Sequence, residues 1–255
     1  MSKLQDKLNE KLDDLAERKS EIQSTEIIET PGSYLAVTQQ AVAIITENLK
    51  NKPISRQSID TIKSPSGGTL VFTIPSITGD DIEKELTGVI LDYTTPRAYW
   101  ETTDPVEGTS PTCYSSDGSL SSEGKACRNC VFNTFGSKEG ETNAKACKES
   151  VELYLLRPDT IMPVIVRIPV SSKLLFQRYL TRLVSHMKPL CGVVTKITLE
   201  KATNKTGQAY AKFNFEAVET LSSEETQGMR AYGNHIMEVL KDDDEIGTTT
   251  LEKVG

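Results

Sequence analysis

Four of the five cysteines are spaced so that they can bind one metal ion. Cys113, Cys127, Cys130 and Cys147 follow the pattern C-x13-C-x2-C-x16-C, and Cys191 lies apart from them. A CxxC pair offers two thiolates to one ion, and Zn²⁺ accepts four thiolates because its filled d shell imposes no geometry of its own. The spacing therefore predicts a structural zinc site with four thiolate ligands, with an iron–sulfur cluster as the alternative that suits the same ligands.

A redox pair or a catalytic zinc site would be the other uses of this motif. Thioredoxin-like chemistry places CxxC at a strand-to-helix turn of a βαβ unit, and no such pattern surrounds Cys127. Catalytic zinc usually has a His or carboxylate ligand and an open position, but His186 and His235 lie far downstream. The P-C-x-x-C signature of deaminases is also missing, since Ala126 precedes Cys127.

Motifs of other chemistry are absent from the sequence. It contains no G-x-x-x-x-G-K-[ST], G-x-G-x-x-G, G-x-S-x-G or H-E-x-x-H, which would indicate phosphate, dinucleotide, acyl-transfer or metalloprotease sites. The sequence therefore favours a protein that is not an enzyme. A nuclease or other nucleic-acid enzyme is the disfavoured hypothesis.

Charge is distributed unevenly along the chain. The formal net charge is -7, and this total alone argues against a nucleic-acid binder. However, residues 160–212 hold nine bases and a single acid, a net charge of +8, whereas residues 216–255 hold ten acids and three bases. A basic centre is the electrostatic property expected of a surface that binds phosphates.

Aromatic side chains accompany the basic residues in two places. Single-stranded nucleic acid is bound by stacking its bases on aromatic rings while Lys and Arg contact the phosphates. By the strand period of two, Phe213 and Phe215 share a face and are expected in the core, while Tyr210 and Lys212 face the other way. The candidate nucleic-acid contacts are Tyr93, Arg97, Tyr99, Trp100, Lys196, Lys201, Lys205, Tyr210 and Lys212.

The chain divides into three parts around these side chains. Residues 1–30 have leucines at helical spacing and predict an amphipathic helix, residues 31–240 form the main domain, and residues 241–255 form an acidic tail predicted to be disordered. Residues 101–150 of the main domain are rich in Gly, Ser, Thr, Asn, Lys and Cys and have few aliphatic residues. Zinc would replace the hydrophobic core that this insert lacks.

The remaining elements of the main domain are mostly strands. Strands are predicted at residues 69–75, 86–100, 151–157, 162–170, 192–201 and 209–218, and helices at 173–186 and 223–240. Ser171 and Ser172 are expected to cap the first helix. Because this helix lies between the third and fourth strand regions, the order matches an OB-fold. The expected fold class is mainly β with flanking helices (α+β), an OB-like five-stranded barrel with an inserted zinc-binding loop region.

The segment from Cys113 to Val218 resembles a group of phage-encoded proteins. The resemblance rests on a Cys-rich stretch, GKACRNCVFNTFGS, then KACKES and LYLL, followed by LLFQRYLTRLVSH and GVVTKITLEKATNKTGQAYAKFNF. Such proteins look like single-stranded-DNA-binding proteins with a zinc-stapled insertion in an OB-like barrel. The resemblance implies non-enzymatic binding of single-stranded DNA in phage replication or recombination, and recruitment of replication proteins by the acidic segment 242–246.

A second function class remains open from the sequence. A zinc-stabilised interaction protein would bind a host or phage enzyme through its acidic ends or its N-terminal helix, and that helix could instead form a homodimer. No apolar run approaches the roughly 20 residues of a spanning helix, and the N-terminus lacks the apolar centre of a signal peptide. The expected location is therefore the cytoplasm, that of the host if the protein is phage-encoded, with no membrane partner. The sequence does not distinguish DNA from RNA as the ligand.

Overall fold

The computed structural model covers the main domain and the last helix of the chain. It describes residues 47–48, 50, 54, 56–102, 110–140, 143–158, 160–204 and 207–251. The predicted N-terminal helix of residues 1–30, and with it the predicted dimer contact, lies outside the described residues.

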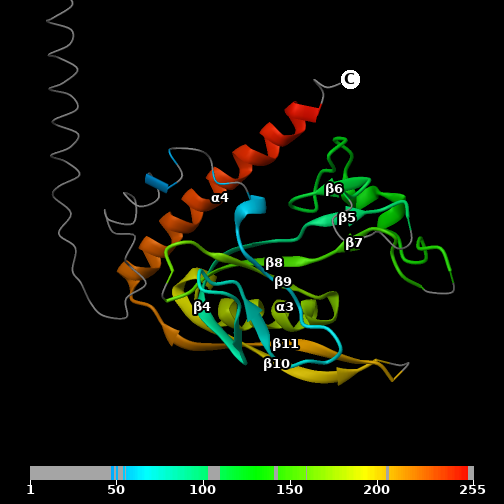
Figure 1. Cartoon of the computed structure of the whole chain (residues 1–255). Helices are drawn as coiled ribbons and strands as arrows, with labels where there is room; N and C mark the ends of the chain where they lie inside the picture. The colour runs from blue at the N-terminus through cyan, green and yellow to red at the C-terminus, as the bar shows by residue number, and fades with distance from the viewer. Residues whose placement is uncertain are drawn as a thin grey trace, which may run out of the picture.

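A six-stranded sheet forms the centre of the molecule (Figure 1). Its strand order is β1-β9-β8-β4-β10-β11, with β1 parallel to β9 and every other neighbouring pair antiparallel. The strands are β1 (Thr61–Ile62), β4 (Glu85–Thr94), β8 (Val151–Leu156), β9 (Val164–Ile168), β10 (Val193–Thr203) and β11 (Ala209–Thr220).

Two smaller sheets and two long helices complete the described structure. The smaller sheets pair β2 (Phe72–Ile74) with β3 (Asp81–Glu83), and β5 (Arg97–Tyr99) with β6 (Cys113–Ser115) and β7 (Lys148–Glu149). The helices are α3 (Val170–Ser185) and α4 (Ser223–Leu251), and 3-10 turns lie at η1 (Arg56–Ser58), η2 (Cys127–Asn129), η3 (Val131–Asn133) and η4 (Leu190–Gly192). The predicted mainly β, α+β class is therefore confirmed.

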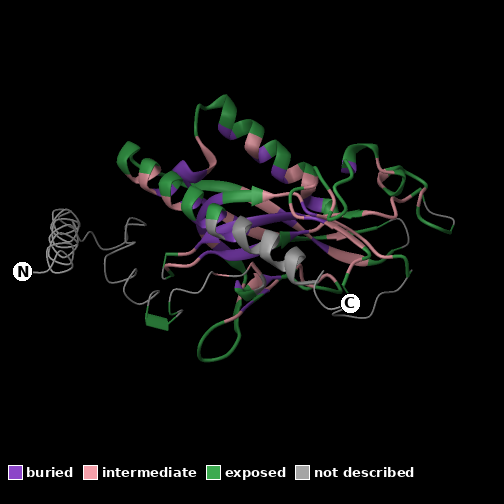
Figure 2. Ribbon diagram, turned by 90° about the horizontal axis from the view of Figure 1, so that it is seen from above, coloured by how far each residue is buried: buried purple, intermediate pink, exposed green. Residues whose placement is uncertain are grey.

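The two faces of the central sheet are covered by different helices. On β8, Leu153 and Leu155 join the apolar cluster that contains Phe176 of α3, whereas Tyr154 and Leu156 belong to the clusters against α4. Successive residues of a strand point to opposite faces, so a strand covered on both sides has no exposed positions. All six residues of β8 are buried, and Figure 2 shows the buried residues concentrated in this sheet.

The sheet does not close into a barrel within the described residues, because β9 and β11 are not paired with each other. The chain between β1 and β2 bridges this gap instead. β1 pairs with β9, and the ring of Phe72 packs edge-on against Phe213 of β11 at 5.5 Å between centroids. Gly68, at a φ of +73°, lies so close to Ala209 that an added Cβ would be 2.9 Å from the alanine Cβ. We call residues 61–74 the bridging segment.

Helix α3 begins differently from the prediction. It starts at Val170, with Pro169 at the N-cap position and no side-chain cap. Ser172 is buried, and its hydroxyl accepts a hydrogen bond of 2.9 Å from the backbone N–H of Phe213. The expectation that Ser171 and Ser172 cap the helix was wrong, because the buried N–H of an edge strand needs this acceptor more than the helix end does.

Helix α4 is longer than the sequence predicts. It was expected to end near residue 240 and to be followed by a disordered tail, but it continues to Leu251. No proline, the residue that most strongly interrupts a helix, occurs in residues 241–251. Among the described residues, no helix is both long and apolar enough to cross a membrane.

Gly88 of β4 provides a test of how tightly the central sheet is packed. A Cβ at this position would lie 2.3 Å from the carbonyl oxygen of Leu156 on β8. We expect Gly88→Ala to reduce the free energy of unfolding by about 1–3 kcal/mol, because β4 and β8 must separate locally. Urea denaturation followed by circular dichroism measures this change. Thr87→Ala on the same strand is the control, and equal stability of the two variants would contradict the prediction.

Candidate nucleic-acid interface

The insert between β4 and β8 is held by short strands and turns. β5 lies between β6 and β7, and the two 3-10 turns η2 and η3 follow one another at residues 127–133. The backbone N–H of Cys127 donates to the carbonyl of Ser119 at 2.8 Å, and that of Ser122 to Tyr114 at 2.7 Å. Within the described part of residues 101–150, Cys127 is the one buried hydrophobic side chain. The described part of the insert therefore lacks an apolar core, in agreement with its composition.

The four clustered cysteines occupy neighbouring elements of this insert, and none of them is in a disulfide. Burial raises the pKa of Cys113, and the charges of Cys127 and Cys130 raise it further. Burial also raises the pKa of Cys147, where Arg97 acts in the opposite direction and the other three thiols add to the increase. Each thiol is thus within electrostatic range of the others. The described His, Cys, Asp and Glu side chains nevertheless include no group of three at metal-binding geometry.

The donor set of the cluster suits zinc. Four thiolates form a complete tetrahedral ligand set, and the CxxC turn is already folded as a 3-10 turn in which the N–H of Cys130 bonds to the carbonyl of Cys127 at 3.3 Å. Cys113 and Cys147 approach from the strand β6 and from the residue before β7. These four thiols are the residues that would hold the ion.

Two aromatic rings are stacked beside the cysteine cluster. Tyr99 and Phe132 lie 4.0 Å apart between centroids, at an interplanar angle of 11°. Tyr99 is paired in register with Cys113, and the carbonyl of Phe132 accepts a hydrogen bond of 2.8 Å from the N–H of Cys147. The stack is therefore positioned by the same backbone that positions the cysteines.

Lysines lie over further rings of the insert. Lys148 Nζ is 5.4 Å from the centre of the Trp100 ring, and Lys145 Nζ is 4.8 Å from that of Phe135. Phe135 is 70% exposed. With the stacked pair, these residues place aromatic faces and ammonium groups on one part of the surface, which is the combination that binds single-stranded nucleic acid.

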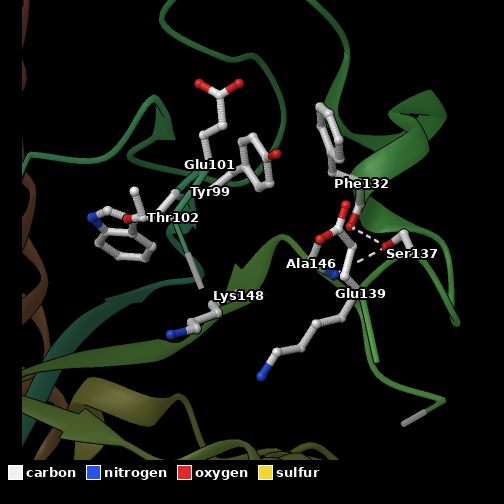
Figure 3. A pocket seen from close by; sticks show the side chains of 10 residues that line it. Tyr99, Glu101, Thr102, Phe132, Ser137, Glu139, Ala146 and Lys148 are labelled. Atoms are coloured by element: carbon white, nitrogen blue, oxygen red, sulfur yellow. Dashed lines mark hydrogen bonds between the residues drawn. The ribbon is translucent and has the colours of Figure 1, made fainter. Parts of the chain in front are cut away.

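A pocket of about 230 Å³ lies among these residues (Figure 3). Tyr99, Trp100 and Phe132 form its aromatic part, and Lys138, Lys148, Glu101 and Glu139 contribute charged groups. We call this the insert pocket. The sequence identified Tyr99 and Trp100 as candidates but missed Phe132, Phe135, Lys145 and Lys148. A signal for them was present, because Phe132 and Phe135 are large apolar residues in a stretch with no core to fill.

Arg97 does not act as a free phosphate contact in this arrangement. Its side chain is 17% exposed and forms an ion pair with Glu149 at 2.7 Å. It also donates to Oδ1 of Asn133, whose amide nitrogen donates to the carbonyl of Cys127 at 2.9 Å. Lys173 of α3 pairs with the same Glu149. Arg97 therefore connects the cysteine turn with the start of α3.

A buried carboxylate ties the insert to the central sheet. Glu152 of β8 is 1% exposed and forms ion pairs with Arg56 and with Arg167, the latter at 2.8 Å. Arg56 also donates to the hydroxyl of Tyr114 in the insert at 2.8 Å, and to that of Tyr154 at 3.3 Å. Glu152 is the centre of a network that joins η1, the sheet and the insert.

The other predicted contacts lie outside the insert. Lys196 pairs with Glu216 across β10 and β11 at 3.1 Å, and Lys212 lies 5.9 Å over the ring of Tyr210. Lys201 is exposed near the end of β10. Tyr93 on β4 packs edge-on against Phe176 at 5.2 Å. The one candidate outside the described residues is Lys205. The expected core position of Phe213 is confirmed, since its side chain is fully buried.

Comparison with known proteins adds no relative. No protein-family model, no curated protein and no solved structure matches the chain.

Proposed function

We propose that this protein binds single-stranded DNA without catalysing a reaction on it, and that it acts in phage replication or recombination. The observation that carries the proposal is the insert pocket, where three aromatic rings and two lysines line one cavity. Stacking contributes about 1–3 kcal/mol per base, and lysines supply the salt-dependent attraction to phosphates.

The strand order supports an OB-like fold as the framework for binding. With β4, β8, β9, β10 and β11 taken as strands one to five, the order in the sheet is 3-2-1-4-5, and α3 falls between strands three and four. An OB-fold is a partly open five-stranded barrel that binds oligonucleotides with its strand face and its L12 and L45 loops. In this assignment the insert would correspond to the L12 loop. The β10–β11 turn, next to Tyr210 and Lys212, would correspond to the L45 loop.

Zinc bound by Cys113, Cys127, Cys130 and Cys147 is the cofactor of this proposal. A structural ion supplies no reaction here; it replaces the apolar core that the insert lacks. The positions of the cysteines support this role. Tyr99 pairs in register with Cys113, the carbonyl of Phe132 accepts a hydrogen bond from the N–H of Cys147, and Lys148 follows Cys147 directly. The ligands would therefore fix the binding surface.

Replacement of Trp100 tests the proposed function. Trp100→Ala is expected to weaken binding of a fluorescein-labelled oligonucleotide by about 5- to 150-fold, because one stacking face is lost. Fluorescence anisotropy at several salt concentrations measures this effect. Leu120→Ala is the matched control, since Leu120 is an exposed apolar residue of the insert that does not line the pocket.

A second variant tests the β10–β11 hairpin. If the DNA strand passes from the insert to the L45 position, Tyr210→Ala combined with Lys212→Ala is expected to weaken binding of the same oligonucleotide. The double variant should also reduce the dependence of affinity on salt. Absence of salt-dependent binding by the wild-type protein at micromolar concentration would refute the function itself.

A further inference from the structure

The insert pocket contains acidic groups that DNA phosphates alone do not explain. Glu101 and Glu139 line it together with the aromatic rings, and neither carboxylate has an ion-pair partner among the described residues. Carboxylates repel the phosphates of a nucleic acid, so two of them beside a stacking surface weaken general binding. Their presence is favourable only if the ligand offers N–H donors to them.

The other polar groups of the pocket further restrict which ligands can bind there. The hydroxyl of Ser137 lies within hydrogen-bond distance of the carbonyls of Phe132 and Thr134, to which it can donate, and it accepts from the N–H of Ala146. Its hydrogen bonds are therefore made within the loop. The charged groups that line the pocket are the carboxylates of Glu101 and Glu139, which only accept, and the ammonium groups of Lys138 and Lys148, which only donate. The ligand needs adjacent donors on one edge and acceptors nearby.

The size and the aromatic faces of the pocket indicate one small planar ring system. Its volume of about 230 Å³ is below the roughly 300–1,000 Å³ of pockets for drug-sized molecules. The rings of Tyr99 and Phe132 offer flat faces beside this space (Figure 3). The Trp100 ring also lines it. A nucleobase has this shape, and it stacks with an energy that depends little on its identity. Base preference must then come from the charged groups.

Among the four bases, guanine matches those groups best. Its N1–H and N2–H₂ donors lie side by side and can bond to both oxygens of one carboxylate, while O6 and N7 accept from an ammonium group. Thymine offers one N–H between two carbonyl oxygens, which a carboxylate repels. We propose that the insert pocket binds one guanine base of the single strand through Glu101 or Glu139, an inference that rests on the proposed DNA-binding function.

The test compares oligonucleotides by fluorescence anisotropy with the full-length protein. The probes are a thymine-only strand, the same strand with isolated guanines, and the latter with inosine in place of guanine. Isolated guanines avoid quadruplexes, and inosine lacks the N2 amino group. We expect the guanine strand to bind about 10-fold more tightly than the thymine strand, and inosine to lose most of this preference.

Variants assign the preference to the carboxylates. Glu101→Gln combined with Glu139→Gln should remove the guanine preference while thymine-strand affinity stays equal or rises, because two negative charges are gone. Each single variant then identifies the carboxylate that contacts the base. Glu123→Gln, an exposed acid of the insert outside the pocket, is the matched control and should keep the preference.

The outcomes separate this inference from the proposed function. Equal affinity of the wild-type protein for all three strands would overturn guanine selection and leave DNA binding intact. A guanine preference that survives in the double glutamine variant would overturn the role of the carboxylates. Absence of binding to any strand would refute both proposals.

Discussion

Removal of zinc is expected to abolish single-stranded-DNA binding while the central sheet stays folded. The described part of the insert has no apolar core of its own, and its aromatic stack is held by backbone next to Cys113 and Cys147. Structural zinc sites contribute folding free energy directly, so the insert should unfold when the ion is lost. The central sheet has separate apolar clusters on both faces. It should therefore stay folded when the insert unfolds.

Three measurements check this prediction. Chelation of the wild-type protein should release about one zinc per chain, a stoichiometry expected for four thiolate ligands. Hydrogen exchange should then accelerate in residues 110–149 and remain slow in β8 and β10. Oligonucleotide affinity should fall more than about 150-fold, which exceeds the largest loss expected for one stacked base.

Cysteine variants sharpen the result. Cys147→Ser should reproduce the loss of zinc and of DNA binding. Cys191→Ala should retain both, because Cys191 is buried against α4 in a separate cluster. A Cys147→Ser protein with unchanged zinc content would show that the ligand assignment is wrong, and iron with sulfide in the purified protein would point to a cluster instead.

Replacement of Glu152 by alanine is expected to be the most destabilising single change. Glu152 is 1% exposed and pairs with Arg56 and Arg167, so its removal leaves guanidinium groups without their counter-charge. Loss of one partner of a buried ion pair costs about 3–5 kcal/mol. Urea denaturation measures the free energy of unfolding, and Glu152→Gln is the variant to use if the alanine protein does not fold.

An exposed pair of the same chemistry is the control for this result. Glu123 pairs with Lys125 at 2.6 Å, but the two side chains are 54% and 78% exposed. Glu123→Ala should therefore leave the free energy of unfolding nearly unchanged, because solvent screens an exposed pair. If Glu152→Ala were no more destabilising than Glu123→Ala, the network around Glu152 would not anchor the insert as described.

Much of the strand content could be predicted from the sequence because its patterns are local. The apolar run of β8 and the alternation of β10 and β11 identify strands without knowledge of their partners. Phe213 could be placed in the core by the period of two. The insert could be recognised by composition, since Gly, Ser and Thr replace aliphatic residues there.

The features that the sequence did not predict depend on contacts between residues that are distant in sequence. Arg97 was expected to contact phosphates, but its guanidinium forms an ion pair with Glu149 and donates a hydrogen bond to Asn133. Ser172 was expected to cap a helix, but its hydroxyl accepts a hydrogen bond from the backbone N–H of Phe213 on β11. The acid Glu83 and the strand β3 around it were missed, since this short strand is defined by pairing with β2 and by Arg157 at 2.7 Å. No local pattern encodes such contacts.

The bridging segment has a consequence for folding during synthesis. Residues 61–74 leave the ribosome before their partners on β9 and β11 have been made. Until then the buried faces of Ile62, Phe72 and Ile74 have nothing to cover them. Contacts of this sequence separation slow folding and expose apolar surface to aggregation. The nascent chain is therefore most vulnerable between synthesis of this segment and synthesis of β11, and chaperone binding should concentrate in that interval.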